Sequence, residues 1–173
     1  MRLVHCCEAA HADAILEIFN DAIEHSTAIY EYHPRDRAFM TSWWAAKEKG
    51  HFPVLGLEND EGVLMAFASY GTFRAYPAFK YSVEHSIYVQ KDYRGRRLAP
   101  LLMRALIDEA TKRDVHVMIG AIDAENQASL SLHKRLGFQP AGVIREAGFK
   151  FGRWLDLAFY QLLLATPSTP VDG

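Results

Sequence analysis

The sequence is poor in cysteine and has no long apolar run. Only two of its 173 residues are cysteines, the adjacent Cys6 and Cys7, which are too few for a disulfide framework. No stretch approaches the roughly 20 apolar residues that span a bilayer, and the first residues lack the apolar segment of a secretory signal. We therefore expect a soluble, cytoplasmic protein with no membrane partner.

An excess of charge of one sign is also missing. The chain has 19 Lys and Arg against 21 Asp and Glu, so its formal net charge is -2. This near balance gives no global attraction to nucleic acid or to an anionic lipid surface. We expect no nucleic-acid partner, and any anion must be bound by a local cluster of basic groups.

Two familiar nucleotide-binding motifs and the common metal motifs are absent. The chain has no Gly-rich loop that ends in Gly-Lys-Ser/Thr, and no Gly-x-Gly-x-x-Gly fingerprint after its first strand. Its histidines and cysteines show neither His-Glu-x-x-His nor Cys-x-x-Cys spacing. We predict no metal.

The hydrophobic half of the sequence is arranged in alternating helical and strand-like segments. Its length suits one domain, which we place at residues 1–166, with a disordered tail at 167–173. The apolar spacing predicts helices around 15–23, up to Gly50, from Leu98 and over 127–136, and strands at 3–4, 52–57, 63–68, 81–89, 115–119, 143–147 and 149–164, with Gly148 at the last turn.

Two features of this pattern carry chemistry. Within the strand at 81–89, alternation places Glu84 mid-strand, on the face opposite Val83 and His85. After that strand, the basic turn Arg94–Ala99 opens a helix, whose unpaired N–H groups and positive dipole end suit a pyrophosphate. The alternative for the turn is an ordinary solvated basic loop.

Two ordered motifs resemble the GNAT acetyltransferase superfamily. Arg94-Gly95-Arg96-Arg97-Leu98-Ala99 is similar to the Q/R-x-x-G-x-G/A signature, and the segment 126–138 resembles the N-x-x-S-x-x-L-(Y/H)-x-x-x-G-F segment. The resemblance implies the GNAT fold, an α/β fold with a central mixed, mainly antiparallel sheet and helices on both faces. It also implies acetyl-CoA as cosubstrate. Arg97 stands where the signature usually has a glycine, so its side chain either adds a phosphate contact or alters the turn.

A narrower resemblance covers nearly the whole chain. The segments Val83–Val89 and Gly148–Asp156 resemble the phosphinothricin and methionine sulfoximine acetyltransferase branch. This implies acetylation of the α-amine of a small amino-acid analogue, such as phosphinothricin, methionine sulfoximine or methionine sulfone, by a homodimer. Acetylation of a protein N-terminus or of another metabolite amine is one alternative. A non-catalytic acyl-CoA-binding module is another.

The resemblance and the residue types together suggest roles for particular side chains. Glu84 is the candidate general base, and its alternatives are a structural ion pair with a nearby cation or exposure on an edge strand. His133 is the candidate general acid for the departing thiolate, and a packed, hydrogen-bonded histidine is the alternative. Arg74 suits a substrate carboxylate.

The remaining candidates fall into two groups. The expected cofactor-binding residues are Ile87, Tyr88, Val89, Arg94, Gly95, Arg96, Arg97, Leu98, Ala99 and Asn126, the last of which also reads as a helix N-cap. The expected substrate-binding residues are Arg74 and the aromatic side chains Tyr76, Phe79 and Tyr30, although such aromatic groups often fill cores or subunit contacts.

Overall fold

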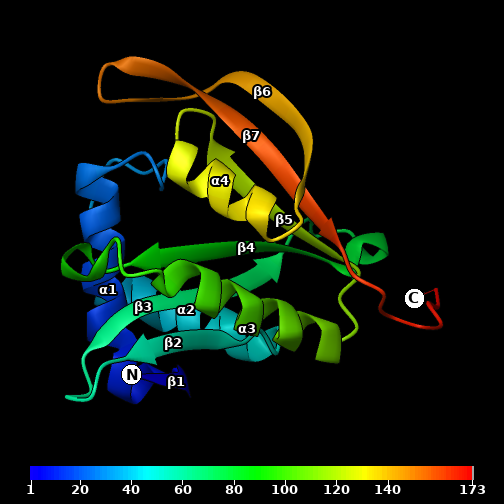
Figure 1. The fold of residues 1–173 in the computed structure, drawn as a ribbon, viewed down its shortest axis with the longest axis horizontal. Coiled ribbons are helices and arrows are strands. Elements are labelled where there is room, and N and C mark those ends of the chain that lie inside the picture. Colours follow the sequence, from blue (N-terminus) through cyan, green and yellow to red (C-terminus); the bar gives the residue numbers. More distant parts are fainter. Residues whose placement is uncertain (173) are drawn as a thin grey trace. The chain divides into compact units, whose positions relative to one another are not determined.

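The computed structural model describes residues 1–172, which form alternating strands and helices (Figure 1). The elements are β1 (Arg2–His5), α1 (Glu8–His25), α2 (Arg37–Lys49), β2 (Val54–Glu58), β3 (Leu64–Thr72), the 3-10 turn η1 (Pro77–Phe79), β4 (Ser82–Val89), the 3-10 turn η2 (Lys91–Tyr93), α3 (Leu98–Lys112), β5 (Val117–Asp123), α4 (Gln127–Arg135), β6 (Gln139–Lys150) and β7 (Arg153–Leu163).

The chain divides into two compact units that are each discontinuous in sequence. The first unit comprises Met1–Ser69 and Ser86–Leu106, and the second comprises Tyr70–His85 and Ile107–Gly173. Strands β3 and β4 and helix α3 therefore contribute residues to both units. The expectation of a single domain over 1–166 stays a prediction.

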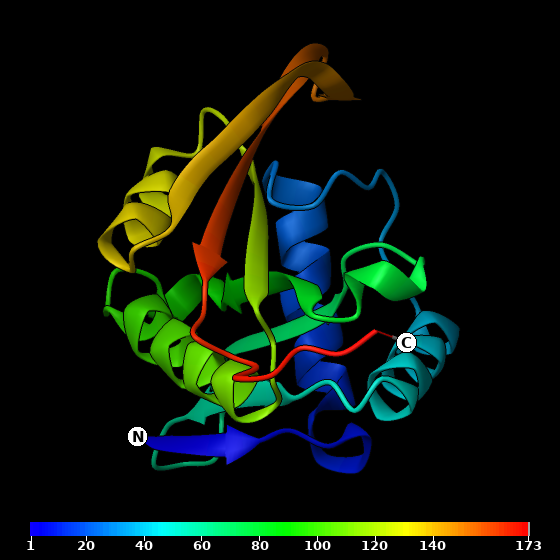
Figure 2. The ribbon, with the colours of Figure 1, turned by 90° about the vertical axis from the view of Figure 1, so that its right-hand side faces the viewer.

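The first unit is built on three antiparallel strands. Strand β2 pairs with β1 on one side and with β3 on the other, with Leu57 opposite Leu3 and Leu55 opposite Ala68. Helices α1 and α2 lie on one face of these strands and the start of α3 lies on the other, as both views show (Figures 1 and 2). This arrangement explains why β2 and most of β3 are buried on both faces and read as nearly continuous apolar runs.

Helix α1 supplies most of the apolar core in the first unit. Its residues Ile15, Phe19 and Ile23 recur at helical spacing, are almost fully buried, and pack with Phe67 of β3. Asp36 caps the start of helix α2, because its carboxylate accepts a hydrogen bond from the Phe39 amide in the first turn. Both helices were expected from the sequence.

The second unit contains a parallel pairing, between β4 and β5. Residues Ser82–Glu84 of β4 pair in parallel with Val117–Ile119 of β5, whereas β5 with β7 and β7 with β6 are antiparallel. Together with the first unit, this gives seven strands in a mixed, mainly antiparallel arrangement in the described residues. The predicted α/β fold class is confirmed.

The last hairpin differs from the expectation in the position of its turn. We predicted the turn at Gly148, but β6 continues to Lys150 and the turn is formed by Phe151 and Gly152. Both turn residues have positive φ angles, 52° and 74°, which suit a two-residue connection. Gly148 instead lies inside β6, just after a bulge.

Two further segments complete the second unit. Strand β5 runs over Val117–Asp123, later than the expected 115–119, because the amide of Val115 still bonds to the carbonyl of Ala110 behind α3. In the tail, the N–H of Val171 donates to the Tyr81 hydroxyl over 3.1 Å. Disorder over 167–173 stays a prediction, and Gly173 lies outside the described residues.

Candidate active site

Neighbouring side chains of strand β4 point to opposite faces of the strand. This alternation places Glu84 and His85 in different environments. Glu84 is exposed, whereas Val83 and His85 on either side of it are buried. Glu84 pairs in register with Ile119 of β5. The expected mid-strand carboxylate is therefore present and reaches the surface of the strand rather than the core.

The Glu84 carboxyl has an unusual electrostatic environment. Although the side chain reaches solvent, surrounding protein raises its pKa above the ordinary value, and the nearby positive charge of Arg74 opposes this effect. The Arg74 guanidinium lies 5.1 Å from the centre of the Phe73 ring. The structure thus brings two predicted residues, the candidate base and the candidate carboxylate ligand, within electrostatic reach.

On the buried face of β4, His85 meets His133 of α4. The two Nε2 atoms are 3.0 Å apart, and the rings stack with an interplanar angle of 21°. Gly120 of β5 makes this possible, since a Cβ atom there would lie 2.9 Å and 3.0 Å from the same two nitrogens. Phe138 closes the stack, edge-on to both rings.

The acceptors around this histidine pair determine where its hydrogens lie. Nδ1 of His133 is 2.7 Å from the carbonyl oxygen of Ser129, which can only accept, so Nδ1 carries the hydrogen. In a neutral His133, Nε2 then accepts from the Nε2–H of His85. Nδ1 of His85 is left as a buried acceptor without a hydrogen-bond partner in the described residues. Both rings are neutral in this arrangement.

These contacts bear on the role expected of His133. Its side chain is 1% exposed and both of its ring nitrogens contact protein groups. Such geometry favours the packed, hydrogen-bonded histidine over a proton donor that meets the substrate. The general-acid role stays a prediction.

The basic turn lies in the first unit and contains two residues in the left-handed backbone conformation. Gly95 and Arg97 have φ angles of 78° and 59°, and α3 begins at Leu98. A Cβ atom at Gly95 would meet nothing within 4 Å, so the turn is open. Arg97 keeps the left-handed conformation that favours glycine, which is where the signature has one.

The three arginines of the turn have different surroundings. The Arg94 guanidinium pairs with Asp21 of α1 at 2.7 Å. The Arg96 guanidinium stacks on Tyr93 at 4.9 Å. Arg97 is exposed and makes no hydrogen bond or ion pair within residues 1–172. Two of the three cations are therefore held by the protein, and Arg97 is the one left available to a ligand.

The other expected cofactor contacts have simpler positions. Ile87, Tyr88 and Val89 end β4 and are each partly buried, and Ala99 lies in the first turn of α3. In the second unit, Asn126 caps α4, because its side-chain oxygen accepts from the Ser129 amide at 3.1 Å. The capping role of Asn126 is confirmed, and its amide nitrogen is not used in that bond.

The predicted substrate-binding aromatics are only partly brought together. Phe79 packs edge-on against Phe73, with 5.8 Å between the ring centres. The Arg74 guanidinium contacts the same Phe73 ring. Tyr76 is 74% exposed and has no ring contact in the described part of the chain. Tyr30 belongs to the first unit and is partly exposed.

Sequence reasoning missed two residues that organise these groups. His85 was read only as one of several histidines, although its alternation with Glu84 placed it on the inner face. Asp21, the partner of Arg94, lies on α1, 73 residues away in sequence. Because Asp21 and Arg94 are so far apart in the sequence, no local pattern could have predicted their ion pair.

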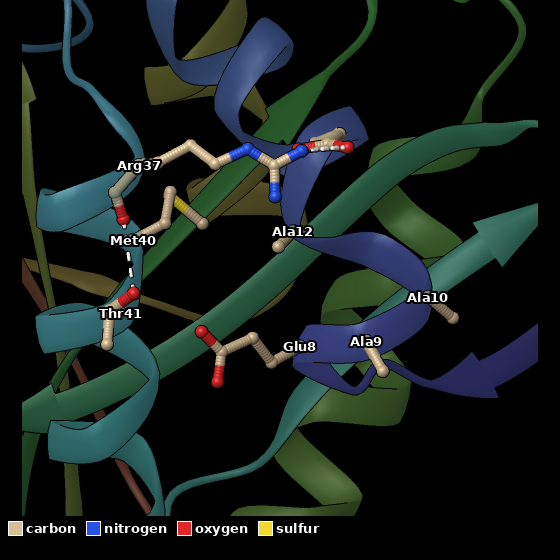
Figure 3. Close-up of a pocket in the computed structure, with 8 residues that line it drawn as sticks. Glu8, Ala9, Ala10, Ala12, Arg37, Met40 and Thr41 are labelled. Atoms are coloured by element: carbon tan, nitrogen blue, oxygen red, sulfur yellow. Dashed lines mark hydrogen bonds and ion pairs between the residues drawn. The ribbon is translucent and has the colours of Figure 1, made fainter.

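Neither of the two clearest surface cavities contains the predicted catalytic residues. One, of about 180 Å³, lies between α1 and α2, with Glu8, Thr41 and the ion pair of Arg37 and Asp13 on its walls (Figure 3). The other, of about 240 Å³, includes Asp21. Within residues 1–172, no three potential metal ligands gather, and no helix is both long and apolar enough to cross a bilayer.

Comparison with known proteins identifies the family. The model of the acetyltransferase (GNAT) family matches residues 13–138. The chain belongs to this family. It is therefore an acetyl-transferring enzyme.

Individual relatives are similar over nearly the full chain. A solved structure from Acinetobacter baylyi is 56% identical, covers 99% of this chain and 97% of its own, and gives a TM-score of 0.99. The L-methionine sulfoximine/L-methionine sulfone acetyltransferase of Pseudomonas aeruginosa is 43% identical over 93% of this chain and 94% of its own length. A Sinorhizobium meliloti phosphinothricin acetyltransferase, solved with acetyl-CoA, is 29% identical over 98% and 91%, with a TM-score of 0.92.

The histidine pair of this acetyltransferase predicts a loss of stability in acid. Burial, and then the charge of His133, lowers the pKa of His85 to about 3, and burial lowers that of His133. Unfolded imidazoles titrate near 6.5, so the unfolded chain binds more protons. The stabilising contribution is complete above pH ~6.5 and is lost as the pH falls from there towards 3.

Urea unfolding between pH 7 and pH 4.5 measures this effect. We expect the free energy of unfolding to fall less steeply in His85→Leu than in the unmodified protein, by up to about 1.4 kcal/mol per pH unit for the one proton removed. His5→Gln, which removes an exposed histidine, is the matched control and should leave the slope unchanged. Equal slopes in the unmodified protein and His85→Leu would contradict the buried neutral pair.

Proposed function

We propose that this enzyme transfers the acetyl group of acetyl-CoA to the α-amine of a small amino-acid analogue, with Glu84 as the general base. The observation that carries the proposal is the Glu84 carboxyl, whose pKa is raised by the surrounding protein and which lies near the Arg74 cation. A base that must remove an ammonium proton works best with a pKa moved towards the working pH. The names of the relatives support the same substrate class.

The basic turn has the chemistry expected of a site for the acetyl-CoA pyrophosphate. The free amides at the start of α3, the open cradle at Gly95 and the unpaired Arg97 cation are all groups that bind phosphate oxygens. The partly buried end of β4, at Ile87–Val89, offers backbone groups to the rest of the cofactor, and Asn126 offers its amide nitrogen. Bound acetyl-CoA would supply the acetyl group as an activated thioester.

The residues of the second unit would prepare the amine. An amino acid arrives as an ammonium, and Glu84 takes its proton directly or through one water, leaving the nitrogen lone pair free to attack. Arg74 holds the α-carboxylate with a planar, bidentate pair of hydrogen bonds. The amine and the carboxylate of an α-amino acid are bonded to the same carbon atom. Two protein groups that bind them must therefore lie near each other, as Arg74 and Glu84 do.

The departing thiolate needs a proton. His133 is our candidate from the resemblance, and an imidazole is suited to this step near neutral pH. In the neutral pair, the N–H of His133 donates to the Ser129 carbonyl and its other ring nitrogen accepts from His85, so both of its ring nitrogens are engaged by protein groups. The packed role therefore remains the main alternative for His133.

We further propose phosphinothricin, methionine sulfoximine and methionine sulfone as substrates, and a cytoplasmic homodimer as the working form. The β6–β7 hairpin supports association, since it exposes an unusual number of large apolar side chains: Val143, Ile144, Phe149, Phe151 and Trp154. Such a surface on one hairpin is typical of an interface between subunits.

Replacing Glu84 tests the proposed function. In a thiol-release assay with acetyl-CoA and the three proposed substrates, we expect Glu84→Gln to lower kcat by roughly 10²- to 10⁴-fold, because the general base is lost. Binding of acetyl-CoA should be retained. Glu61→Gln, in the exposed turn before β3, is the matched control and should keep full activity. Unchanged turnover in Glu84→Gln would remove Glu84 as the base, and reaction with peptides or polyamines alone would remove the substrate class.

Replacing Arg97 separates backbone strain from phosphate binding. Arg97→Gly relieves a left-handed residue, so the free energy of unfolding should rise by about 1 kcal/mol. The same change removes the unpaired cation, so the Kd for acetyl-CoA should rise roughly three- to tenfold. Calorimetry and urea unfolding measure the two effects.

Arg97→Lys is the control for charge. It keeps the cation and the strained backbone, so both the affinity and the stability should stay close to those of the unmodified enzyme. If Arg97→Gly bound acetyl-CoA as tightly as the unmodified enzyme, or more tightly, the phosphate contact of Arg97 would be ruled out.

A further inference from the structure

The segment that follows β7, residues 164–171, is hydrogen-bonded to the residues just before β5, and we call it the strap. The Thr166 hydroxyl donates to the Val115 carbonyl over 2.6 Å, and the Thr166 carbonyl accepts from Nδ1 of His116 over 2.9 Å. The Leu164 amide donates to the His116 carbonyl over 2.8 Å. All of these residues belong to the second unit, so the strap leaves β7 along a defined path within that unit.

The strap is bonded a second time at Tyr81, the residue that precedes β4. The N–H of Val171 donates to the Tyr81 hydroxyl over 3.1 Å, and this hydroxyl faces the Val171 carbonyl oxygen at 3.4 Å. A phenol hydroxyl can accept and donate at once, so one backbone residue can engage both of its functions. Because the contact is made at the far end of the side chain, it fixes the orientation of the Tyr81 ring.

The backbone of Tyr81 and the strand after it are held without the strap. The Tyr81 carbonyl accepts from the amides of His116 and Val117, over 2.8 Å and 3.1 Å. Strand β4 then pairs with β5 as far as Glu84. These ladder bonds do not involve the Tyr81 hydroxyl, so its removal should leave the candidate base in place.

The loop before Tyr81, which carries Arg74, has much less support. Its residues 74–80 are all exposed. Its short turn η1 is closed by the amides of Phe79 and Lys80, which each donate over 3.0 Å to a carbonyl oxygen three residues earlier. Exposed backbone hydrogen bonds with little burial around them are typical of a segment that opens locally at a small cost in free energy.

A chain of ring contacts connects Tyr81 to Arg74 through this loop. The Lys80 ammonium, at the end of η1, lies 5.1 Å from the centre of the Tyr81 ring. Phe79 packs edge-on against Phe73, and the Arg74 guanidinium lies over the same Phe73 ring. A Tyr81 ring with a fixed orientation therefore favours one arrangement of the turn, and the turn favours one position of the Arg74 guanidinium.

We propose that Tyr81, held by the strap, is a positioning residue for Arg74 and thereby increases the affinity of the enzyme for the α-carboxylate of its substrate. This inference rests on the proposed function, in which Arg74 binds that carboxylate. An arginine that is already oriented loses less conformational freedom when it binds its ligand. Tyr81 acts through the loop and needs no contact with the substrate.

Steady-state kinetics with L-methionine sulfone and saturating acetyl-CoA test the assignment. Tyr81→Phe should raise KM roughly three- to tenfold and change kcat by less than about twofold, because Arg74 is loosened while Glu84 stays in place. In the Arg74→Gln background, Tyr81→Phe should raise KM no further, since the residue that it positions is gone. An unchanged KM in Tyr81→Phe, or the same rise in both backgrounds, would overturn the assignment.

A matched pair of strap variants tests the second anchor. Thr166→Val removes the hydroxyl that bonds to the Val115 carbonyl, and should raise KM in the same direction by a smaller factor. Thr169→Val makes the same chemical change at an exposed strap position and should leave KM unchanged. If Tyr81→Phe fails to fold in a circular-dichroism melt, Thr166→Val against Thr169→Val decides by the same criterion.

Hydrogen exchange of the Phe79 and Lys80 amides, followed by NMR, tests the hold on the loop without any activity. We expect both amides to exchange roughly tenfold faster in Tyr81→Phe than in the unmodified enzyme. Unchanged exchange would refute the role of the strap and leave acetyl transfer intact. If the unmodified enzyme acetylates no amino acid, the proposed function fails, and faster exchange in Tyr81→Phe would still support the hold of the strap on the loop.

Discussion

The contact between His85 and His133 over Gly120 determines which way strand β4 faces. The two neutral rings are hydrogen-bonded to each other, and they occupy the space that a Cβ atom at residue 120 would fill. This contact places His85 on the buried side of the strand. Alternation then requires Glu84 to leave the opposite side, where Arg74 is within electrostatic reach. The position of the candidate base thus follows from a buried contact in which it takes no part.

In the first unit, the three arginines of the basic turn are not equally compensated. Asp21 neutralises Arg94 and Tyr93 covers Arg96, which leaves Arg97 as an uncompensated cation on a strained backbone. Strain and unpaired charge both reduce stability, and such features persist where a ligand uses them.

The fold was largely predictable from the sequence, because the apolar periodicity of α1 and the alternation of β4 follow directly from which face is buried. The cofactor role of the basic turn Arg94–Ala99 was predicted only with the family resemblance. The left-handed φ of Arg97 explains why the signature has a glycine at that position. The pairing of His85 with His133 and that of Asp21 with Arg94 join residues far apart in the chain, so no local pattern reveals them. The shift of the last turn to Phe151 and Gly152 depended on a bulge in β6 that composition does not encode.

The fold gives Glu84 the properties of a general base, and the pKa of its carboxyl group is the direct test of this role. Titration of ¹³C-labelled Glu84 by NMR, in the unmodified enzyme and in Arg74→Gln, isolates the two causes. We expect a pKa above the ordinary value of 4.5 in the unmodified enzyme, because burial disfavours the charged form, and a further rise when the Arg74 cation is removed. A pKa at or below 4.5, or one that does not respond to Arg74→Gln, would contradict the account.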